Sequence, residues 1–278
     1  MKNLLDRKDK IAFSFLKKEY LQPALPVPLL FTHVPKCGGT TIDRILRSTF
    51  RMSKSSPDFE TLRRIKITLS NRGSLAHLSE SATLLLLYAA EKGSTYLGGH
   101  FPVDTVSLNY LKSLKKFSCI TILREPYSRL VSNYIYRKVR CWTLGYILPP
   151  SSTLVEKNFV TQEKKEILDF YESDEGKFQL NIYSKMFGSG SYENAQETIK
   201  QYDLVGTLAR IDRFGEDLSK LLGKKINIRH LNKIEQQPYQ KEIELLNKIF
   251  REEEIYRELQ SKLYEEQQFY AWASTYSS

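Results

Sequence analysis

One stretch near the N-terminus constrains the fold more than any other, because an apolar strand leads through a lysine and two glycines into a helix. The strand runs from Leu29 to Val34, and apolar residues then recur at helical spacing from Ile42 to Phe50. The turn between them reads Pro35-Lys36-Cys37-Gly38-Gly39-Thr40-Thr41. Glycines let the backbone approach an anion, and the first-turn N–H groups and Lys36 supply positive charge. We therefore predict a phosphate-binding loop here, in preference to an ordinary strand-to-helix turn.

The composition is typical of one large folded α/β domain with a hydrophobic core, and it argues against a disordered chain. Of 278 residues, 41% are hydrophobic and 12% aromatic. The formal net charge of +10 indicates an anionic ligand, but nucleic acid, acidic glycan and lipid headgroups all satisfy it. Charge alone does not choose among these partners.

Cysteine usage and hydropathy indicate the compartment. Cys37, Cys119 and Cys141 are odd in number and lack CxxC spacing, so neither a disulfide framework nor a zinc site is indicated. Residues 1–20 lack the apolar core of a signal peptide, and the longest apolar run, residues 84–90, is too short to span a bilayer. We expect a soluble, cytoplasmic protein with reduced thiols and no transmembrane segment.

Further strands and helices alternate along the chain. Short buried strands are predicted at residues 95–99, 117–123 and 203–208, each followed by a helix. Other helices are predicted at residues 81–92, 211–222 and 241–273. This alternation is typical of an α/β fold, which we describe as a P-loop-like central parallel β-sheet flanked by helices on both faces, with a helical C-terminal part. Residues 1–26 are an N-terminal lead-in, and residues 27–278 are a single domain.

A second informative stretch begins where the predicted strand 117–123 ends. Arg124 follows the strand, Pro126 suits a first helical turn, and Ser132 lies two turns further on. Arg124 and Ser132 can therefore converge on one phosphate at the carboxyl edge of the sheet. Taken singly, Arg124 could instead form a salt bridge to a helix carboxylate, and Ser132 could be an ordinary solvated residue. A Walker A loop, with Gly-Lys followed by Ser or Thr, is absent, so nucleoside triphosphate hydrolysis is the less favoured use.

Together these stretches resemble the sulfotransferases that use 3′-phosphoadenosine 5′-phosphosulfate (PAPS), in the branch of the heparan sulfate 2-O- and 6-O-sulfotransferases and their bacterial relatives. The resemblance extends over most of residues 28–270. It implies that PAPS is the donor and 3′-phosphoadenosine 5′-phosphate (PAP) the product. It also implies a 5′-phosphosulfate loop and a 3′-phosphate site, whose residues would be Lys36, Cys37, Gly38, Gly39, Thr40, Thr41, Arg124 and Ser132.

Other segments extend the resemblance. Gly99-His100-Phe101-Pro102 is similar to the segment that carries the family's catalytic histidine, and Asn181-Ile182-Tyr183-Ser184 resembles an internal family element. Three departures stand out: Cys37 replaces the usual Thr or Ser, Glu125 replaces the usual Asp, and the membrane anchor of the Golgi members is missing.

The chemistry of sulfuryl transfer suggests roles for individual residues independently of the resemblance. Charge builds on the departing 5′-phosphate during in-line transfer, so Lys36 and the loop amides would stabilise it. The acceptor hydroxyl must lose a proton, and histidine, with a pKa of ~6.5, suits that task. Of four histidines, His33, His77, His100 and His230, only His100 sits at the predicted carboxyl end of a strand behind two glycines. We therefore predict Lys36 and His100 as catalytic residues.

Glu125 is the carboxylate alternative to His100, although orienting Arg129 or capping its own helix suits it better. No metal is expected, because a sulfuryl group needs less counter-charge than a phosphoryl group and no cluster of ligands at metal spacing occurs.

The acceptor is expected to be a hydroxyl of a carbohydrate or glycosylated metabolite, and this expectation rests on the resemblance alone. Residues 138–190 hold aromatic and basic side chains that could contact it, or could equally be core aromatics and a solvated face. These are Arg140, Trp142, Tyr146, Tyr171, Lys177, Tyr183 and Lys185.

Two other function classes stay open. A P-loop-type kinase would use a nucleotide and a divalent metal. A non-catalytic nucleic-acid-binding protein would fit the positive charge, although no RNP-type aromatic run or helix-turn-helix signature supports it.

Overall fold

A four-stranded parallel sheet forms the centre of the fold. The computed structural model describes residues 23–50, 84, 86–114, 117–147, 156–228 and 239–276. The strands are β1 (Leu29–Thr32), β2 (Tyr96–Gly99), β3 (Ser118–Leu123) and β4 (Leu204–Thr207), in the spatial order β2-β1-β3-β4. All neighbours are parallel, and Leu30 pairs with Leu97 on one side and Cys119 on the other. Their unbroken apolar runs suit a sheet buried on both faces.

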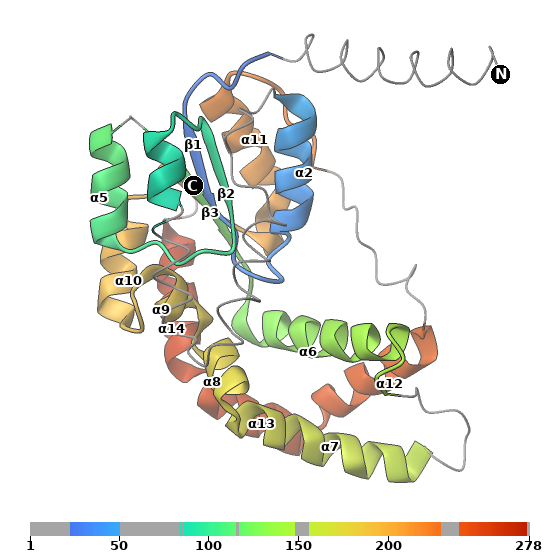
Figure 1. The fold of residues 1–278 in the computed structure, drawn as a ribbon. Helices are drawn as coiled ribbons and strands as arrows, with labels where there is room; N and C mark the ends of the chain where they lie inside the picture. Colours follow the sequence, from blue (N-terminus) through green and yellow to red (C-terminus); the bar gives the residue numbers. More distant parts are fainter. Residues whose placement is uncertain are drawn as a thin grey trace, which may run out of the picture.

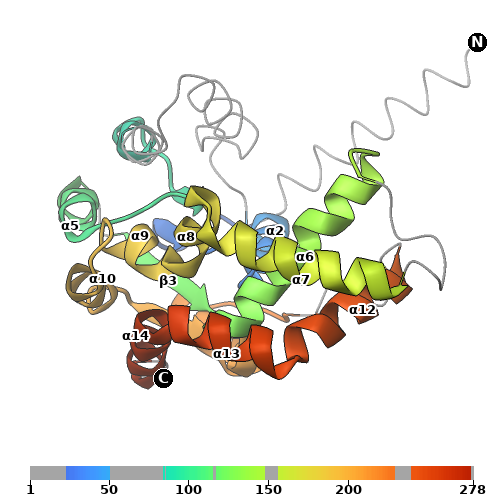
Figure 2. The same cartoon turned by 90° about the horizontal axis from the view of Figure 1, so that it is seen from below.

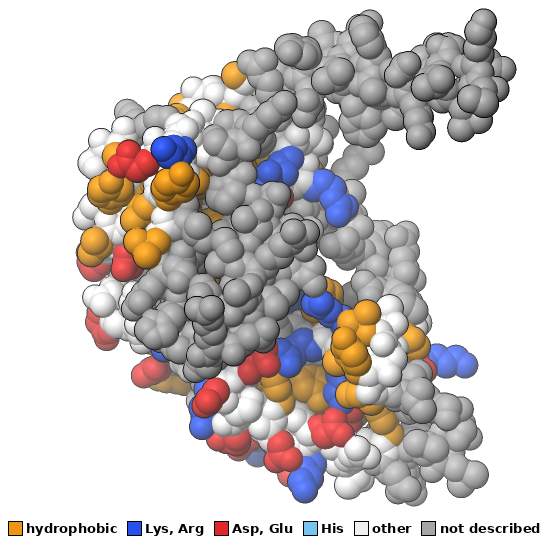
Figure 3. Space-filling view, viewed as in Figure 1, with side chains coloured by type: hydrophobic (Ala, Val, Ile, Leu, Met, Phe, Trp, Pro, Cys, Tyr) orange, Lys and Arg blue, Asp and Glu red, His pale blue; other side chains and the backbone are white. Residues whose placement is uncertain are grey.

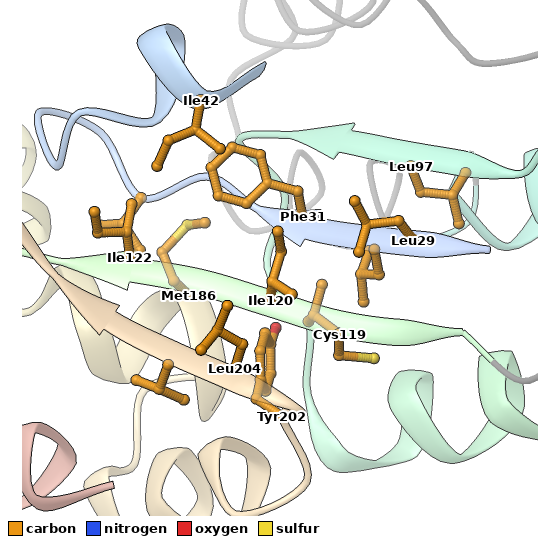
Figure 4. Close-up of a cluster of buried hydrophobic side chains, with 14 of the residues drawn as sticks. Leu29, Phe31, Ile42, Leu97, Cys119, Ile120, Ile122, Met186, Tyr202 and Leu204 are labelled. Atoms are coloured by element: carbon orange, nitrogen blue, oxygen red, sulfur yellow. The ribbon is translucent and has the colours of Figure 1, made fainter. Parts of the chain in front are cut away.

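Helices cover both faces of this sheet (Figure 1). Helices α2 (Gly39–Thr49) and α11 (Ile211–Leu222) lie on one side, and α5 (Thr105–Leu114) and α10 (Tyr192–Ile199) lie on the other. Figure 4 shows the sheet core, in which Ile42 of α2 lies beside Phe31 while Met186 and Leu204 fill the opposite side. The predicted α/β class with a parallel sheet between helical layers is confirmed.

The remaining helices build a second apolar core beyond the carboxyl end of the sheet (Figure 2). Leu130, Ile167, Leu246 and Leu259 are fully buried there. The helices that supply this core are α6 (Pro126–Thr143), α7 (Glu156–Glu172), α8 (Asp174–Leu180), α12 (Gln240–Arg251) and α13 (Glu253–Lys262). Helices α9 (Ile182–Phe187) and α14 (Tyr264–Thr275) return to the sheet core, where α14 contacts β4.

The predicted strands agree with the observed ones to within two residues at either end; the largest difference is that β1 ends at Thr32 and not at Val34. The helix predicted over 211–222 ends at Leu222, and its C-cap Gly223 has a φ of 61°, the left-handed conformation. The C-terminal helical part is confirmed as three helices. Helices α7 to α10 are additional to the elements predicted from the sequence. Most of the lead-in, the basic stretch after residue 50, His77 and His230 lie outside the described residues. Within the described part, no helix combines the length and apolarity needed to cross a bilayer.

Candidate functional site

The topology places the two predicted phosphate-binding stretches next to each other. From β1 the sheet continues to β2 on one side and to β3 and β4 on the other, so the strand order reverses between β1 and β3. Ligands of open parallel sheets bind beyond the carboxyl ends of the strands at such a point. The anion loop (residues 35–41) follows β1 and Arg124 follows β3. Arg124 Nη1 donates a hydrogen bond to the carbonyl of Lys36 at 3.2 Å, which joins the two stretches directly.

The anion loop presents an open helix N-terminus. Gly38 has a φ of 83° and is the N-cap residue of α2. Among the described residues no side chain caps the helix, and its first turn holds no carboxylate. Lys36 also has a positive φ, 65°. A Cβ added to Gly39 would lie 1.9 Å from Cδ2 of His33, so only glycine fits there. The first-turn amides and the positive end of the helix dipole therefore face no capping group within the described residues, which is the feature that an anion site requires.

Two cationic side chains lie at this loop: Lys36, which belongs to it, and Arg124, which contacts its backbone. Burial, and then repulsion from Arg124, lowers the pKa of Lys36 to about 8 despite an opposing contribution from Cys37. Burial also lowers the pKa of Arg124. None of the ion pairs found among the described residues involves Lys36 or Arg124, so the salt-bridge interpretation of Arg124 finds no support there. Lys36 Nζ instead lies 4.0 Å from the centroid of the Tyr136 ring.

Helix α6 directs Ser132 toward the same region. Ser132 and Tyr136 are four residues apart and share a helix face, and Tyr136 contacts Lys36, so this face looks toward the anion loop. Glu125 is the N-cap of α6: its carboxylate accepts hydrogen bonds from the amides of Tyr127 (2.9 Å) and Ser128 (2.7 Å). Capping is thus the role that the structure gives Glu125.

His100 follows β2 and is exposed at the same carboxyl edge. Its Nδ1 lies 2.6 Å from the carbonyl oxygen of His33, and the two imidazole rings lie 4.1 Å apart, centroid to centroid. His33 is buried between His100 and Phe31, and burial, then His100 and Lys36, holds its pKa well below the usual value. From the sequence, His33 is predicted only as part of the strand, because its contact with His100 depends on the pairing of β1 with β2.

Cys37 belongs to the loop through its backbone only. Its side chain is fully buried, and Sγ lies 3.9 Å from the Tyr183 hydroxyl, so the thiol points into the core. Burial raises its pKa to about 11. Thr40 is exposed and Thr41 is buried in the first turn of α2. The replacement of Thr or Ser by Cys therefore removes no side chain from the anion-facing side.

Three of the candidate acceptor contacts are core residues instead. Trp142 and Tyr171 are buried in the second apolar core, and Tyr183 is fully buried behind the anion loop. The other four candidates are exposed; they are Arg140, Tyr146, Lys177 and Lys185. Figure 3 shows Lys and Arg side chains gathered on the flank that carries α2 and α6. Across the described ranges, no group of three or more His, Cys, Asp or Glu side chains could hold a metal ion.

Comparison with known proteins agrees with this geometry. The family model described as the sulfotransferase family matches residues 27–271. No curated protein matches the chain. The match includes all four strands and both predicted phosphate-binding stretches, which meet at the carboxyl edge of the sheet. This chain therefore belongs to the sulfotransferase family.

Proposed function

We propose that the protein transfers a sulfuryl group from PAPS to an acceptor hydroxyl by in-line displacement. Membership of the family supports sulfuryl transfer in general. The observation that best supports PAPS as the donor is the hydrogen bond from Arg124 to the carbonyl of Lys36. This contact brings two cations from separate stretches of the chain to one edge of the sheet. The donor supplies the activated sulfuryl group and a phosphate leaving group.

The anion loop and Lys36 would bind the 5′ end of the donor. The uncapped N-terminus of α2 provides amide donors, and the Lys36 ammonium is already desolvated, which strengthens its attraction to the charge that develops on the leaving phosphate. Arg124 and Ser132 would bind the 3′-phosphate, which suits a guanidinium fork beside a hydroxyl.

His100 would act as the base. A carbonyl oxygen can only accept, so the contact with His33 requires His100 Nδ1 to carry the proton. In the neutral imidazole, Nε2 then holds the lone pair, which can take the proton from the acceptor hydroxyl. The same bond fixes the ring against rotation, which keeps the base in one orientation.

The acceptor proposal is a hydroxyl on a carbohydrate or glycosylated metabolite. Exposed basic and aromatic side chains between residues 138 and 190 are compatible with sugars and acidic groups: Arg140, Tyr146, Lys177 and Lys185. No metal takes part in this mechanism, because Lys36, Arg124 and the helix N-terminus supply the counter-charge.

A ligand comparison followed by turnover tests the proposal. PAP should raise the melting temperature of the wild-type protein more than ATP with Mg²⁺ does. Arg124→Ala should weaken PAP binding about 10- to 100-fold, the value of a charge-assisted hydrogen bond. His100→Ala should retain PAP binding and lose turnover about 10²- to 10⁴-fold with labelled donor and acceptor. Lys36→Ala should lose turnover as well.

Lys248→Ala, at an exposed position of α12, is the charge-matched control and should behave as wild type. Stabilisation by ATP with Mg²⁺ but not by PAP would favour a kinase. Salt-dependent binding of RNA or DNA without any effect of PAP would favour a nucleic-acid-binding protein. Wild-type turnover in His100→Ala would remove His100 from its role.

A further inference from the structure

Tyr183 of α9 contacts both donor-binding stretches from behind. Its hydroxyl accepts a hydrogen bond from the Arg124 amide at 3.0 Å and donates one to the Arg124 carbonyl. The same hydroxyl lies 3.9 Å from Sγ of Cys37 in the anion loop. One buried side chain from a third part of the chain thus reaches residues 37 and 124.

A phenol hydroxyl suits this position because of where its two backbone partners lie. β3 ends at Leu123, so the peptide groups of Arg124 lie beyond the last strand pair. Buried N–H and C=O groups need partners, and a single hydroxyl can accept from one and donate to the other. Tyr183 therefore completes the hydrogen bonding of the backbone from which the Arg124 side chain projects.

Tyr183 is itself held by its neighbours. Its amide donates to Oε1 of Glu266 on α14 at 3.0 Å, and the Tyr192 hydroxyl donates to Oε2 of the same carboxylate at 2.7 Å. The Tyr183 ring lies 5.6 Å, centroid to centroid, from Phe269. Three helices, α9, α10 and α14, thereby set the place of one hydroxyl group.

We propose that Tyr183 is a positioning residue, which holds Arg124 and the anion loop at the separation that the two ends of the donor require. The link to donor binding rests on the proposed function; the holding of the two stretches does not. Tyr183 contacts backbone and a thiol that face away from the ligand, so it acts through the donor-binding residues and not on the donor.

Tyr183→Phe tests the proposal, because it removes the hydroxyl and keeps the ring. The first readout is the rate at which a thiol reagent labels Cys37 in the native protein, followed peptide by peptide by mass spectrometry. Cys119 in β3 is fully buried too and is an internal control. Loss of one hydrogen bond is worth about a 2- to 12-fold change in an opening equilibrium. Cys37 should therefore be labelled several-fold faster, while Cys119 keeps its wild-type rate.

The second readout is calorimetry with PAP. The dissociation constant should rise several-fold in Tyr183→Phe, and the KM for the donor should rise with it while kcat at saturating donor stays near wild type. Tyr171→Phe is the matched control: it removes a buried hydroxyl whose hydrogen bond goes to the Leu130 carbonyl on α6. PAP affinity should not change in that variant.

The outcomes separate the two proposals. If Cys37 and Cys119 keep their wild-type labelling rates in folded Tyr183→Phe, the positioning role is wrong. If the wild-type protein does not bind PAP, the proposed function fails, and the labelling rates alone decide whether Tyr183 holds the loop. Should Tyr183→Phe not fold, hydrogen exchange on the wild type decides: the Arg124 amide should exchange nearly as slowly as Ile122 in β3, and fast exchange would refute the contact.

Discussion

Gly39→Ala should separate the geometry of the site from the stability of the fold. The added Cβ would lie 1.9, 2.4 and 2.5 Å from Cδ2, Nε2 and Cγ of His33. His33 is 8% exposed and lies between Phe31 and His100, so its ring has little room to retreat. Overpacking of this kind costs about 1–3 kcal/mol, and replacing a helical Gly by Ala offsets up to about 1 kcal/mol. We expect a net loss of about 1–2 kcal/mol.

The melting temperature should then fall by about 2–8 °C for a chain of this size. Turnover should fall by about 100-fold, because a displacement of His33 carries the His100 ring with it, and errors near 1 Å cost that much. Scanning calorimetry and a single-turnover assay with labelled donor measure the two effects.

Gly223→Ala provides the control. Gly223 has a φ of 61° and open space around an added Cβ, so alanine there costs about 1–2 kcal/mol of backbone strain. Both variants should lose similar stability, and only Gly39→Ala should lose turnover. Equal turnover in the two would refute the transmission from Gly39 through His33 to His100. Adding His33→Ala to Gly39→Ala should recover part of the lost stability, since it removes the clash.

Two pH dependences follow from the site and its surroundings. Lys36, whose pKa is lowered by burial and by Arg124 to about 8, loses its charge as the pH rises through that value, so PAP affinity measured by calorimetry should decline above pH 8. Lys36→Arg should abolish the decline; an unchanged decline would assign it to another group. Burial raises the pKa of Glu266 to about 7 from 4.5, so its protonated form favours the folded state below pH 4.5, and this stabilisation is lost as the pH rises through 7. Glu266→Gln should flatten melting temperature against pH over that window, and equal slopes in variant and wild type would contradict the assignment.

Local sequence signals predicted the elements that carry the site. The Gly38-Gly39 pair between an apolar strand and an amphipathic segment predicted the turn into α2, and Pro126 predicted the start of α6. Of the two roles predicted for Glu125, orienting Arg129 or capping the helix, the structure shows the cap. Such signals act within one or two helical turns, so they are visible in a single stretch of chain. The roles of Lys36, His100 and Ser132 in catalysis and binding remain predictions.

Contacts between distant residues were beyond these signals. Tyr183 could be a surface aromatic or a core residue by its local pattern, and its contacts with residues 37 and 124 exist only because α9 lies against the sheet core. Trp142 and Tyr171 were equally ambiguous until the second apolar core enclosed them. Burial is a property of the assembled fold, and a short pattern does not state it.

The sequence by itself determined the parts of the proposed anion site: a glycine turn after one strand, an arginine after another, and a histidine after a third. Tertiary structure alone decided that they meet. The order β2-β1-β3-β4 and the parallel register place the Arg124 side chain on the carbonyl of a lysine 88 positions earlier in the chain. Backbone propensities act over a few residues, whereas strand pairing joins positions that lie far apart, so only the folded sheet converts separate motifs into one site.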